Sequence, residues 1–352
     1  MTRPGQVTPV VTRWSPHTVR CPVSGKESVV PDLNTQPGKR RAARTALSVA
    51  GLVLLLTGCS VTSHTTSADA GPPTSGGMPT AADVLPGLYV ALGDSYTAGP
   101  GIPDQTGGTA GCEQSSSSYP RLVARSLRLE LADMSCSSAT IASLSAPQST
   151  GDGTNPAQLS ALSAATTLVT LGIGGNDVGW SAVITKCTEL DLIPALMSGD
   201  TTSAPCQDYY NSGGTDVIQQ KIHAVAGRLA AALTQIRDRA PRARIYVVGY
   251  PDLLPAAGGA CAHTVGITDG DITFLNDEEL QLNGMLRQTA AAVGDGYIDT
   301  YTPSEGHDAC SAPASRWIEP LLPTAPAAPL HPNAVGEQGM ADAVVQAIKG
   351  AA

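Results

Sequence analysis

From Gly87 onward, short apolar segments alternate with segments of helical periodicity. The segments expected to form strands are residues 88–92, 129–134, 167–173, 244–248 and 297–299. Those expected to form helices are residues 119–128, 216–239, 271–292 and 334–349. Alternation of this kind implies a parallel sheet with helices on both faces, joined by right-handed crossovers. The sequence therefore predicts an α/β protein, built as a three-layer α/β/α sandwich with a mainly parallel sheet.

The first 58 residues have the composition of an export leader. Four basic residues between Lys39 and Arg44 precede the apolar run 46–56, which is too short to span a bilayer by itself. The run ends in Leu-Thr-Gly-Cys59, which resembles the bacterial lipobox, whose cysteine is lipidated and becomes the mature N-terminus. We predict a lipoprotein signal over residues 1–58 and lipidation of Cys59. The alternatives are a plain signal peptide, or a cysteine that stands at this position by chance.

Residues 59–86 are rich in Ser, Thr, Gly, Ala and Pro, a composition that predicts a flexible tether. The tether would lead into one domain over residues 87–352. The protein is therefore expected to be exported. It would be lipid-anchored at the outer face of the cell membrane, or secreted if no lipid is attached.

Charge is distributed unevenly along the chain, whose formal net charge is −9. Residues 1–58 hold 8 Lys/Arg and 2 Asp/Glu, and the remainder holds 13 basic and 28 acidic residues, a net charge of −15. Contacts to a nucleic-acid backbone need a basic face. We therefore expect no nucleic-acid partner, and no electrostatic docking of the acidic domain on anionic lipid.

An even number of cysteines falls in the predicted domain, which favours disulfides in an exported protein. They are Cys112, Cys136, Cys187, Cys206, Cys261 and Cys310. The sequence alone does not choose among their possible pairings. No Cys-x-x-Cys or His-x-x-His spacing occurs, so a zinc site is not expected, and we predict a protein without metal or cofactor.

Ser95 lies just past the carboxyl end of the first predicted strand, and Ser138 and Asn176 follow the second and third. Taken singly, these positions have ordinary interpretations as turns, and His331 before the last helix could be merely structural. However, ligands bind at the carboxyl ends of strands in open α/β sheets, and neighbouring parallel strands end side by side. The three residues can therefore converge, with His331 reaching them from the last crossover.

This set of residues suits acyl transfer, which needs a hydroxyl nucleophile, a base of near-neutral pKa and donors for an oxyanion. Imidazole supplies such a base. The backbone N–H groups of Ser95 and Ser138, with the side-chain amide of Asn176, can supply the donors.

Together these segments resemble the sequence blocks of the SGNH (GDSL-type) hydrolases. The matching blocks are Gly93-Asp94-Ser95, Gly174-Gly175-Asn176-Asp177 and His331-Pro332-Asn333. The actinobacterial secreted esterase/lipase branch is the most similar, through Cys136-Ser137-x-Ala139-Thr140, Arg316-Trp317-Ile318-Glu319-Pro320 and the six domain cysteines. The resemblance covers residues 88–345. It implies a flavodoxin-like SGNH fold, Ser95 as nucleophile, His331 as base and Asn176 as oxyanion donor.

The resemblance to this branch also implies a pairing of sequential cysteines. The implied disulfides are Cys112–Cys136, Cys187–Cys206 and Cys261–Cys310. The first would close a loop beside Ser138, and the second would staple an insertion after Asn176.

Two positions depart from the family pattern. Ser138 stands where the family's second block has glycine; the backbone N–H survives that change. Ala328 stands three residues before His331, where many members have aspartate. As in the actinobacterial branch, the backbone carbonyl of Ala328 or Pro329 would then hold Nδ1–H of the imidazole and fix its tautomer. Asp308 and Glu319 are less favoured substitutes.

Asp94 and Asp177 flank the expected catalytic residues and should brace their loops by hydrogen bonds to backbone N–H groups. Trp180 and Trp317 either line the cleft or pack beneath it. The sequence thus predicts a monomeric extracytoplasmic serine esterase or lipase that cleaves carboxylic esters of small molecules or lipids through an acyl-enzyme. The alternatives are a carbohydrate acetylesterase or phospholipase with the same site, or a surface lipoprotein that binds ligand without turnover.

Overall fold

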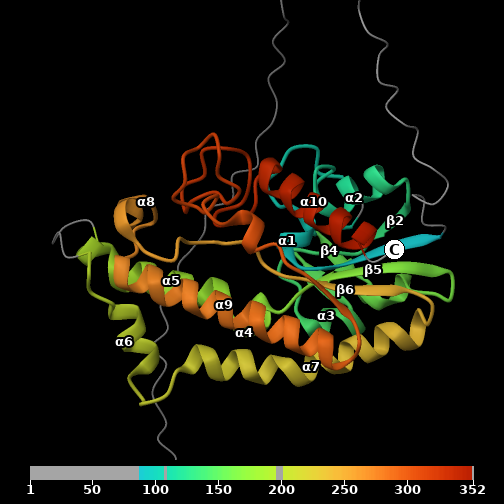
Figure 1. Cartoon of the computed structure of the whole chain (residues 1–352), viewed down its shortest axis with the longest axis horizontal. Helices are drawn as coiled ribbons and strands as arrows, with labels where there is room; N and C mark the ends of the chain where they lie inside the picture. Colours follow the sequence, from blue (N-terminus) through green and yellow to red (C-terminus); the bar gives the residue numbers. More distant parts are fainter. Residues whose placement is uncertain (1–86, 107–108, 196–200, 351–352) are drawn as a thin grey trace, which may run out of the picture. The chain divides into compact units, whose positions relative to one another are not determined.

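The computed structural model describes residues 87–106, 109–195 and 201–350 (Figure 1). The predicted leader, the predicted lipidation site Cys59 and the predicted tether lie outside the described residues. Within them, no helix is long and apolar enough to cross a membrane.

The domain is organised around a five-stranded sheet whose neighbouring strands are all parallel. Its strands are β1 (Leu88–Gly93), β2 (Glu130–Asp133), β5 (Thr166–Gly172), β6 (Arg244–Val248) and β7 (Gly296–Ile298). Their order is β2-β1-β5-β6-β7, which confirms the predicted parallel sheet and has the flavodoxin-like arrangement. The chain leaves β1 first toward β2 and later returns to add β5 on the other side. The ends of β1 and β5 therefore flank the switch point where such folds bind ligands.

Side chains alternate between two apolar layers because successive residues of a strand point to opposite faces. On one face, Tyr89 and Ala91 pack with α2 (Tyr119–Leu127) and α10 (Ala334–Gly350). On the other, Val90 and Leu92 belong to the larger core formed with α7 and α9. Figure 1 shows α2 and α10 above the sheet and α7 and α9 below it. The three-layer α/β/α architecture is thus confirmed.

The two long helices of the lower layer run over α7 (Val217–Arg239) and α9 (Asp269–Ala292). The side chain of Asp216 caps α7, accepting the backbone N–H groups of Ile218 and Gln219 at 2.8 and 2.9 Å. The helix ends at Arg239, and its C-cap Ala240 directly precedes Pro241. Both helices match the predicted ranges to within two residues.

Shorter elements connect the main ones. The α-helices are α1 (Ser95–Ala98), α3 (Ile141–Ser145), α4 (Gly175–Val178), α5 (Trp180–Ile193), α6 (Pro205–Asn211) and α8 (Ala262–Val265). The 3₁₀ helices are η2 (Gln158–Ala161), η4 (Gly259–Cys261) and η5 (Thr302–Ser304). Strands β3 (Gln148–Thr150) and β4 (Gly153–Asn155) form an antiparallel hairpin outside the main sheet. None of these elements was among the predicted strands and helices.

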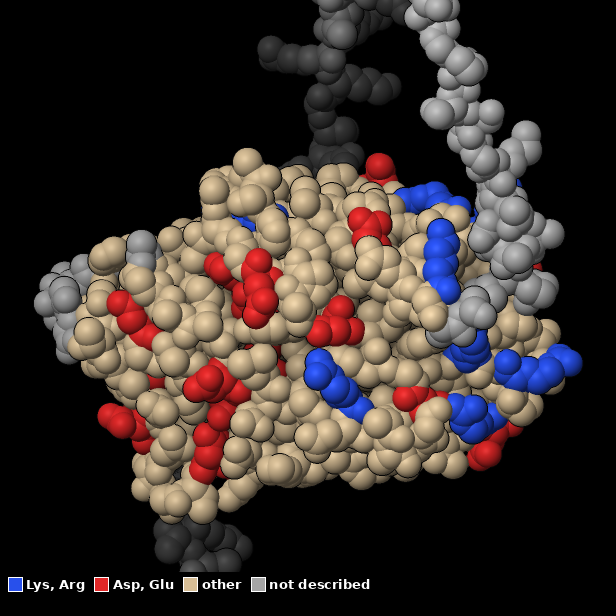
Figure 2. Space-filling model, viewed as in Figure 1, with Lys and Arg blue, Asp and Glu red and all other residues tan. Residues whose placement is uncertain are grey.

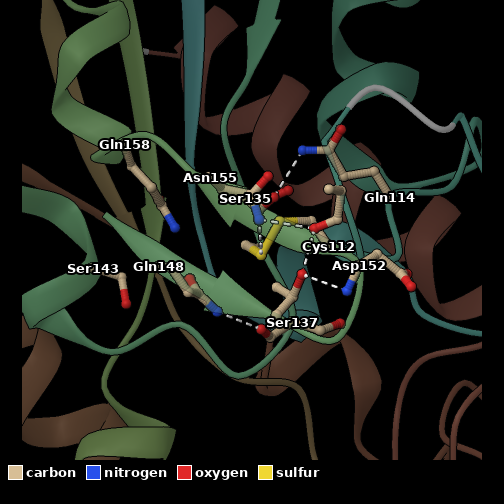
Figure 3. The surroundings of a disulfide bond; sticks show 12 residues. Cys112, Gln114, Ser135, Ser137, Ser143, Gln148, Asp152, Asn155 and Gln158 are labelled. Carbon is tan, nitrogen blue, oxygen red and sulfur yellow. Dashed lines mark hydrogen bonds between the residues drawn. A yellow bond between two sulfur atoms is a disulfide. The ribbon is translucent and has the colours of Figure 1, made fainter. Parts of the chain in front are cut away.

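Three disulfides join Cys112 to Cys136, Cys187 to Cys206 and Cys261 to Cys310. These are the pairs that the family resemblance implies. Figure 3 shows the first pair with Ser135 and Ser137, which belong to the same loop as Ser138 in the sequence. The amide of Gln114 donates to the Ser135 carbonyl at 2.7 Å, and that of Gln148 donates to the Ser137 carbonyl at 2.8 Å. The loop is therefore held by a covalent link and by side chains from two further segments.

Charged groups of both signs are visible on the face drawn in Figure 2. Acidic groups are spread over the left of the view, where the helices α5, α6 and α9 lie, and basic groups gather on the right, toward the sheet. On this face, basic groups thus lie mainly on the right, where some acidic groups lie among them.

Candidate active site

Ser95 begins α1 immediately after β1. The preceding Asp94 caps this short helix, its carboxylate accepting the Tyr96 N–H at 3.0 Å. Gly93 is required where β1 meets β5, because a Cβ atom there would lie 2.6 Å from the Gly172 carbonyl oxygen. Within the described residues, the backbone N–H of Ser95 has no hydrogen-bond acceptor. The serine therefore presents both a hydroxyl and a free N–H at the end of the strand.

His331 lies against Ser95 although the two are separated by most of the domain. Its Nε2 is 2.7 Å from Ser95 Oγ, and its Nδ1 is 2.8 Å from the Pro329 carbonyl oxygen. A carbonyl can only accept, so Nδ1 carries the proton and Nε2 accepts from the serine hydroxyl. Burial lowers the pKa of His331 below its usual 6.5, against the opposing effect of the Pro329 carbonyl. The imidazole is therefore neutral at neutral pH.

The other groups considered for orienting the imidazole are engaged elsewhere. The Ala328 carbonyl accepts the backbone N–H of His331 at 3.2 Å, not its side chain. Glu319 accepts the Asn333 amide at 2.8 Å, and Asp308 accepts the Cys310 N–H at 2.7 Å. Of the expected candidates, the structure places Pro329 alone against Nδ1.

The loop before α10 is fixed from several sides. Leu330 has the left-handed φ of +54°, and its carbonyl accepts the Tyr96 hydroxyl at 2.6 Å. The rings of Tyr96 and His331 lie 4.8 Å apart between centroids. Glu319 N–H donates to the His331 carbonyl at 3.0 Å, and Asn333 caps α10 through Val335 N–H at 2.9 Å. The histidine is thus held on a rigid loop.

Asn176 follows β5 in α4, on the far side of β1 from Ser138. Its side-chain amide donates to the Ala139 carbonyl at 2.9 Å, which leaves one amide hydrogen for another acceptor. The neighbouring Asp177 accepts Ile141 N–H at 2.9 Å and pairs with Arg228 at 2.9 Å. The expectation that Asp94 and Asp177 brace their loops through backbone N–H groups is confirmed.

Ser138 is exposed and adopts a left-handed backbone with φ of +64°. Only glycine adopts such a φ without steric cost, which explains in physical terms the glycine usual at this position of the family. The side chain of Ser138 does not line the cavity beside Ser95. Its backbone N–H has no acceptor among the described residues.

Two residues that hold the loops of the site in position, Tyr250 and Gln158, were not identified from the sequence. The hydroxyl of Tyr250 donates to Asp94 at 2.6 Å and accepts Gly175 N–H at 2.9 Å, so it links the loops after β1 and β5. Gln158 accepts Gly93 N–H at 2.8 Å and donates to the Gly93 carbonyl at 2.9 Å. Tyr250 comes two residues after β6, so the rule of strand ends could have found it. Nothing in the sequence around Gln158 indicates its role.

A cavity of about 220 Å³ opens beside the serine and histidine. Apolar side chains form much of its wall: Trp180, Ile184, Leu253, Leu282, Leu321 and Leu330. Trp180 therefore lines the cavity, whereas Trp317 stacks on His307 at 5.3 Å between centroids and covers Gly339 of α10. No metal-ligating cluster of three His, Cys, Asp or Glu residues exists in the part of the chain that the structure describes.

Comparison with known proteins agrees with this geometry. Residues 91–338 match the model of the GDSL-like lipase/acylhydrolase family. Lipase 2 of Streptomyces coelicolor is 38% identical over 255 residues, which cover 72% of this chain and 83% of that protein. An esterase of Streptomyces scabiei is 30% identical and matches 77% of this chain and 85% of its own.

Two solved structures share the fold over nearly their whole length. Phospholipase A1 from Streptomyces albidoflavus superposes with a TM-score of 0.61 at 29% identity, over 75% of this chain and 99% of its own. The extracellular lipase of Streptomyces rimosus gives 0.60 at 27% identity, over 73% and 98%. The fold and site define an ester hydrolase of the SGNH type. The chain belongs to the GDSL-like lipase/acylhydrolase family.

Proposed function

We propose that this protein hydrolyses carboxylic esters through an acyl-enzyme on Ser95, with His331 as general base. The observation that carries the proposal is the chain of contacts from Ser95 Oγ to His331 Nε2 and from His331 Nδ1 to the Pro329 carbonyl. In the first step, Ser95 Oγ bonds to the ester carbonyl carbon while its proton passes to Nε2. The tetrahedral intermediate then expels the alcohol, which takes that proton. A water molecule then attacks the acyl carbon while His331 takes its proton. The bond to Ser95 Oγ breaks, Oγ receives that proton, and the carboxylic acid is released.

The negative charge of the tetrahedral intermediate needs donors already in place. The free backbone N–H of Ser95, the remaining amide hydrogen of Asn176 and the backbone N–H of Ser138 supply them in this proposal. The Asn176 amide bonds the carbonyl of Ala139, the residue after Ser138. This hydrogen bond links the segments that carry the two donors.

The apolar cavity favours acyl chains of several carbons over acetyl. Trp180, Leu253 and Leu282 offer contact surface that an acetyl group would leave unused. This supports a lipase or phospholipase rather than a carbohydrate acetylesterase. The phospholipase A1 similarity points in the same direction.

The proposed location is extracytoplasmic, with Cys59 lipidated at the outer face of the membrane and residues 59–86 as tether, and the protein monomeric. Three disulfides suit an oxidising compartment. Mass spectrometry of the membrane fraction would show the diacylglyceryl adduct at Cys59. An unmodified N-terminus in the culture medium would replace the anchor by simple secretion.

Kinetics test the function. The full chain, produced in an exporting host, is assayed with p-nitrophenyl esters of increasing acyl length, beside Ser95→Ala and His331→Ala. We expect loss of turnover in both variants and an optimum longer than acetate. A folded wild-type protein that hydrolyses no ester would favour the non-catalytic binding protein, and an acetate optimum would favour the acetylesterase.

A further inference from the structure

A carboxyl group stands in the wall of the cavity that contains Ser95 and His331. Glu279 projects from α9, lines the cavity and is only 2% exposed. Its Oε2 accepts the Leu253 N–H at 3.0 Å. Its Oε1 is buried and has no hydrogen-bond partner among the described residues. Because an unpaired buried polar atom is costly, Oε1 would gain from a hydrogen bond supplied by a ligand in the cavity that Glu279 lines.

The surroundings of Glu279 disfavour the charged form of its own carboxyl group. None of the ion pairs among the described residues includes Glu279. Burial raises the pKa of Glu279 well above its usual value, and the nearby buried Asp252 raises it further, against the Leu253 N–H. A carboxyl group accepts a hydrogen bond from a hydroxyl in either protonation state, and its protonated form can also donate one. Its matching partner is an uncharged hydroxyl group.

The depth of Glu279 distinguishes it from the two hydroxyl side chains that α5 contributes to the cavity wall. Ser181 and Thr185 of α5 are exposed, so they lie at the mouth. Glu279 is buried together with the apolar Leu253 and Leu282. An acyl chain that enters past Ser95 therefore meets apolar walls along its length and a carboxyl group within.

We propose that Glu279 is a specificity-determining residue that selects esters whose acyl chain carries a hydroxyl group. The inference rests on the proposed function, because it assigns the cavity beside Ser95 to the acyl chain. A hydroxyl on the chain pairs with Glu279 Oε1. A plain alkyl chain of equal length buries that oxygen unpaired.

The test compares matched pairs of p-nitrophenyl esters, each pair consisting of an ω-hydroxyacyl ester and the unsubstituted ester of equal length, from four to eight carbons. For wild-type protein we expect kcat/KM to favour the hydroxy ester by about three- to tenfold at one length or more, the effect of one hydrogen bond. Glu279→Leu should reverse this ratio. Glu279→Gln, whose amide also donates and accepts, should retain the preference. Glu278→Gln is the matched control, since Glu278 is a buried neighbour on α9 that does not line the cavity.

A wild-type preference for the unsubstituted ester at every length would overturn the proposal, as would an equal ratio in wild type and Glu279→Leu. A binding measurement separates this failure from failure of the proposed reaction. Titration calorimetry of Ser95→Ala, with and without Glu279→Leu, compares methyl ω-hydroxyalkanoates with methyl alkanoates. Tighter binding of the hydroxy compounds that Glu279→Leu abolishes supports the role of Glu279 even without turnover. Equal binding contradicts it.

Discussion

The hydroxyl of Tyr250 lies 2.6 Å from the carboxylate of Asp94 and donates a hydrogen bond to it. The same hydroxyl accepts the Gly175 N–H. One phenol therefore connects the segment that carries Ser95 with the segment that carries Asn176, across the switch point of the sheet. The geometry of the proposed oxyanion hole thus involves a residue whose hydroxyl bonds neither Ser95 Oγ nor His331 Nε2.

We expect Tyr250→Phe to lower the free energy of unfolding by about 1–3 kcal/mol, because it leaves two buried polar groups unpaired. It should lower kcat more than it changes KM, because the shift affects oxyanion donors rather than the apolar wall. Chemical denaturation and steady-state kinetics measure the two effects. Tyr246→Phe is the matched control, since no hydrogen bond of its hydroxyl occurs among the described residues. Equal effects of the two substitutions would contradict the role of Tyr250.

The left-handed backbone of Ser138 predicts that replacing this serine by glycine stabilises the protein. Ser138→Gly should raise the free energy of unfolding by up to about 1 kcal/mol, because glycine adopts φ of +64° without steric cost. Ser138→Ala keeps the Cβ atom and removes only the hydroxyl, so it should give no such gain. Denaturant midpoints of the three proteins measure this. A glycine variant no more stable than the alanine variant would contradict the strain at this position.

The lowered pKa of His331 predicts the acid limb of activity. The imidazole acts as base only when neutral, so kcat/KM should be constant above its pKa and fall as the pH drops through it. Because burial lowers that pKa, the midpoint should lie below 6.5. A pH profile of kcat/KM on a neutral ester gives the midpoint. A midpoint above 6.5 would contradict the buried, carbonyl-held imidazole.

The raised pKa of Asp94 predicts that its contribution to stability falls as the pH rises. An ordinary ion-paired carboxylate, whose pKa is lowered, would show the opposite dependence. Burial raises its pKa from 3.8 to about 7, against the hydrogen bonds from Tyr250 and Tyr96. Between these values the folded state binds more protons than the unfolded state, so Asp94 lowers stability as the pH rises from about 4 to about 7. Asp94→Asn removes this titration. As the pH rises over that range, the free energy of unfolding of wild type should therefore fall relative to that of Asp94→Asn. A difference between the two proteins that does not change with pH would contradict the raised pKa of Asp94.

Much of the fold could be predicted because its signals are local. The apolar run of β1 and the helical periodicity of α7 each appear in one continuous segment, and Asp216 and Pro241 mark the ends of the helix. Helix α5 was missed because its exposed Leu192 and Ile193 blur the contrast between its two faces. The β3–β4 hairpin is only three residues on each side, too short for an alternating pattern.

In the candidate site, too, the residues with a local sequence signal could be predicted and the others could not. Ser95, Asn176 and His331 could be predicted because each is part of a motif next to a strand end or helix start. The sequence left two candidates for the carbonyl that bonds His331 Nδ1, those of Ala328 and Pro329. The choice between them depends on the conformation of the turn before His331, which the sequence does not give. Tyr250, Gln158 and Glu279 act through tertiary contacts that no local pattern reveals. The left-handed φ of Ser138 is likewise a property of the folded loop.

Covalent labelling of the nucleophilic serine tests the central claim most directly. The full-length protein is treated with a fluorophosphonate, which bonds covalently to an activated serine, and the digested protein is examined by mass spectrometry. We predict one adduct, on Ser95, with labelling abolished in Ser95→Ala and strongly slowed in His331→Ala. An adduct on another serine, or equal labelling of wild type and His331→Ala, would contradict the account.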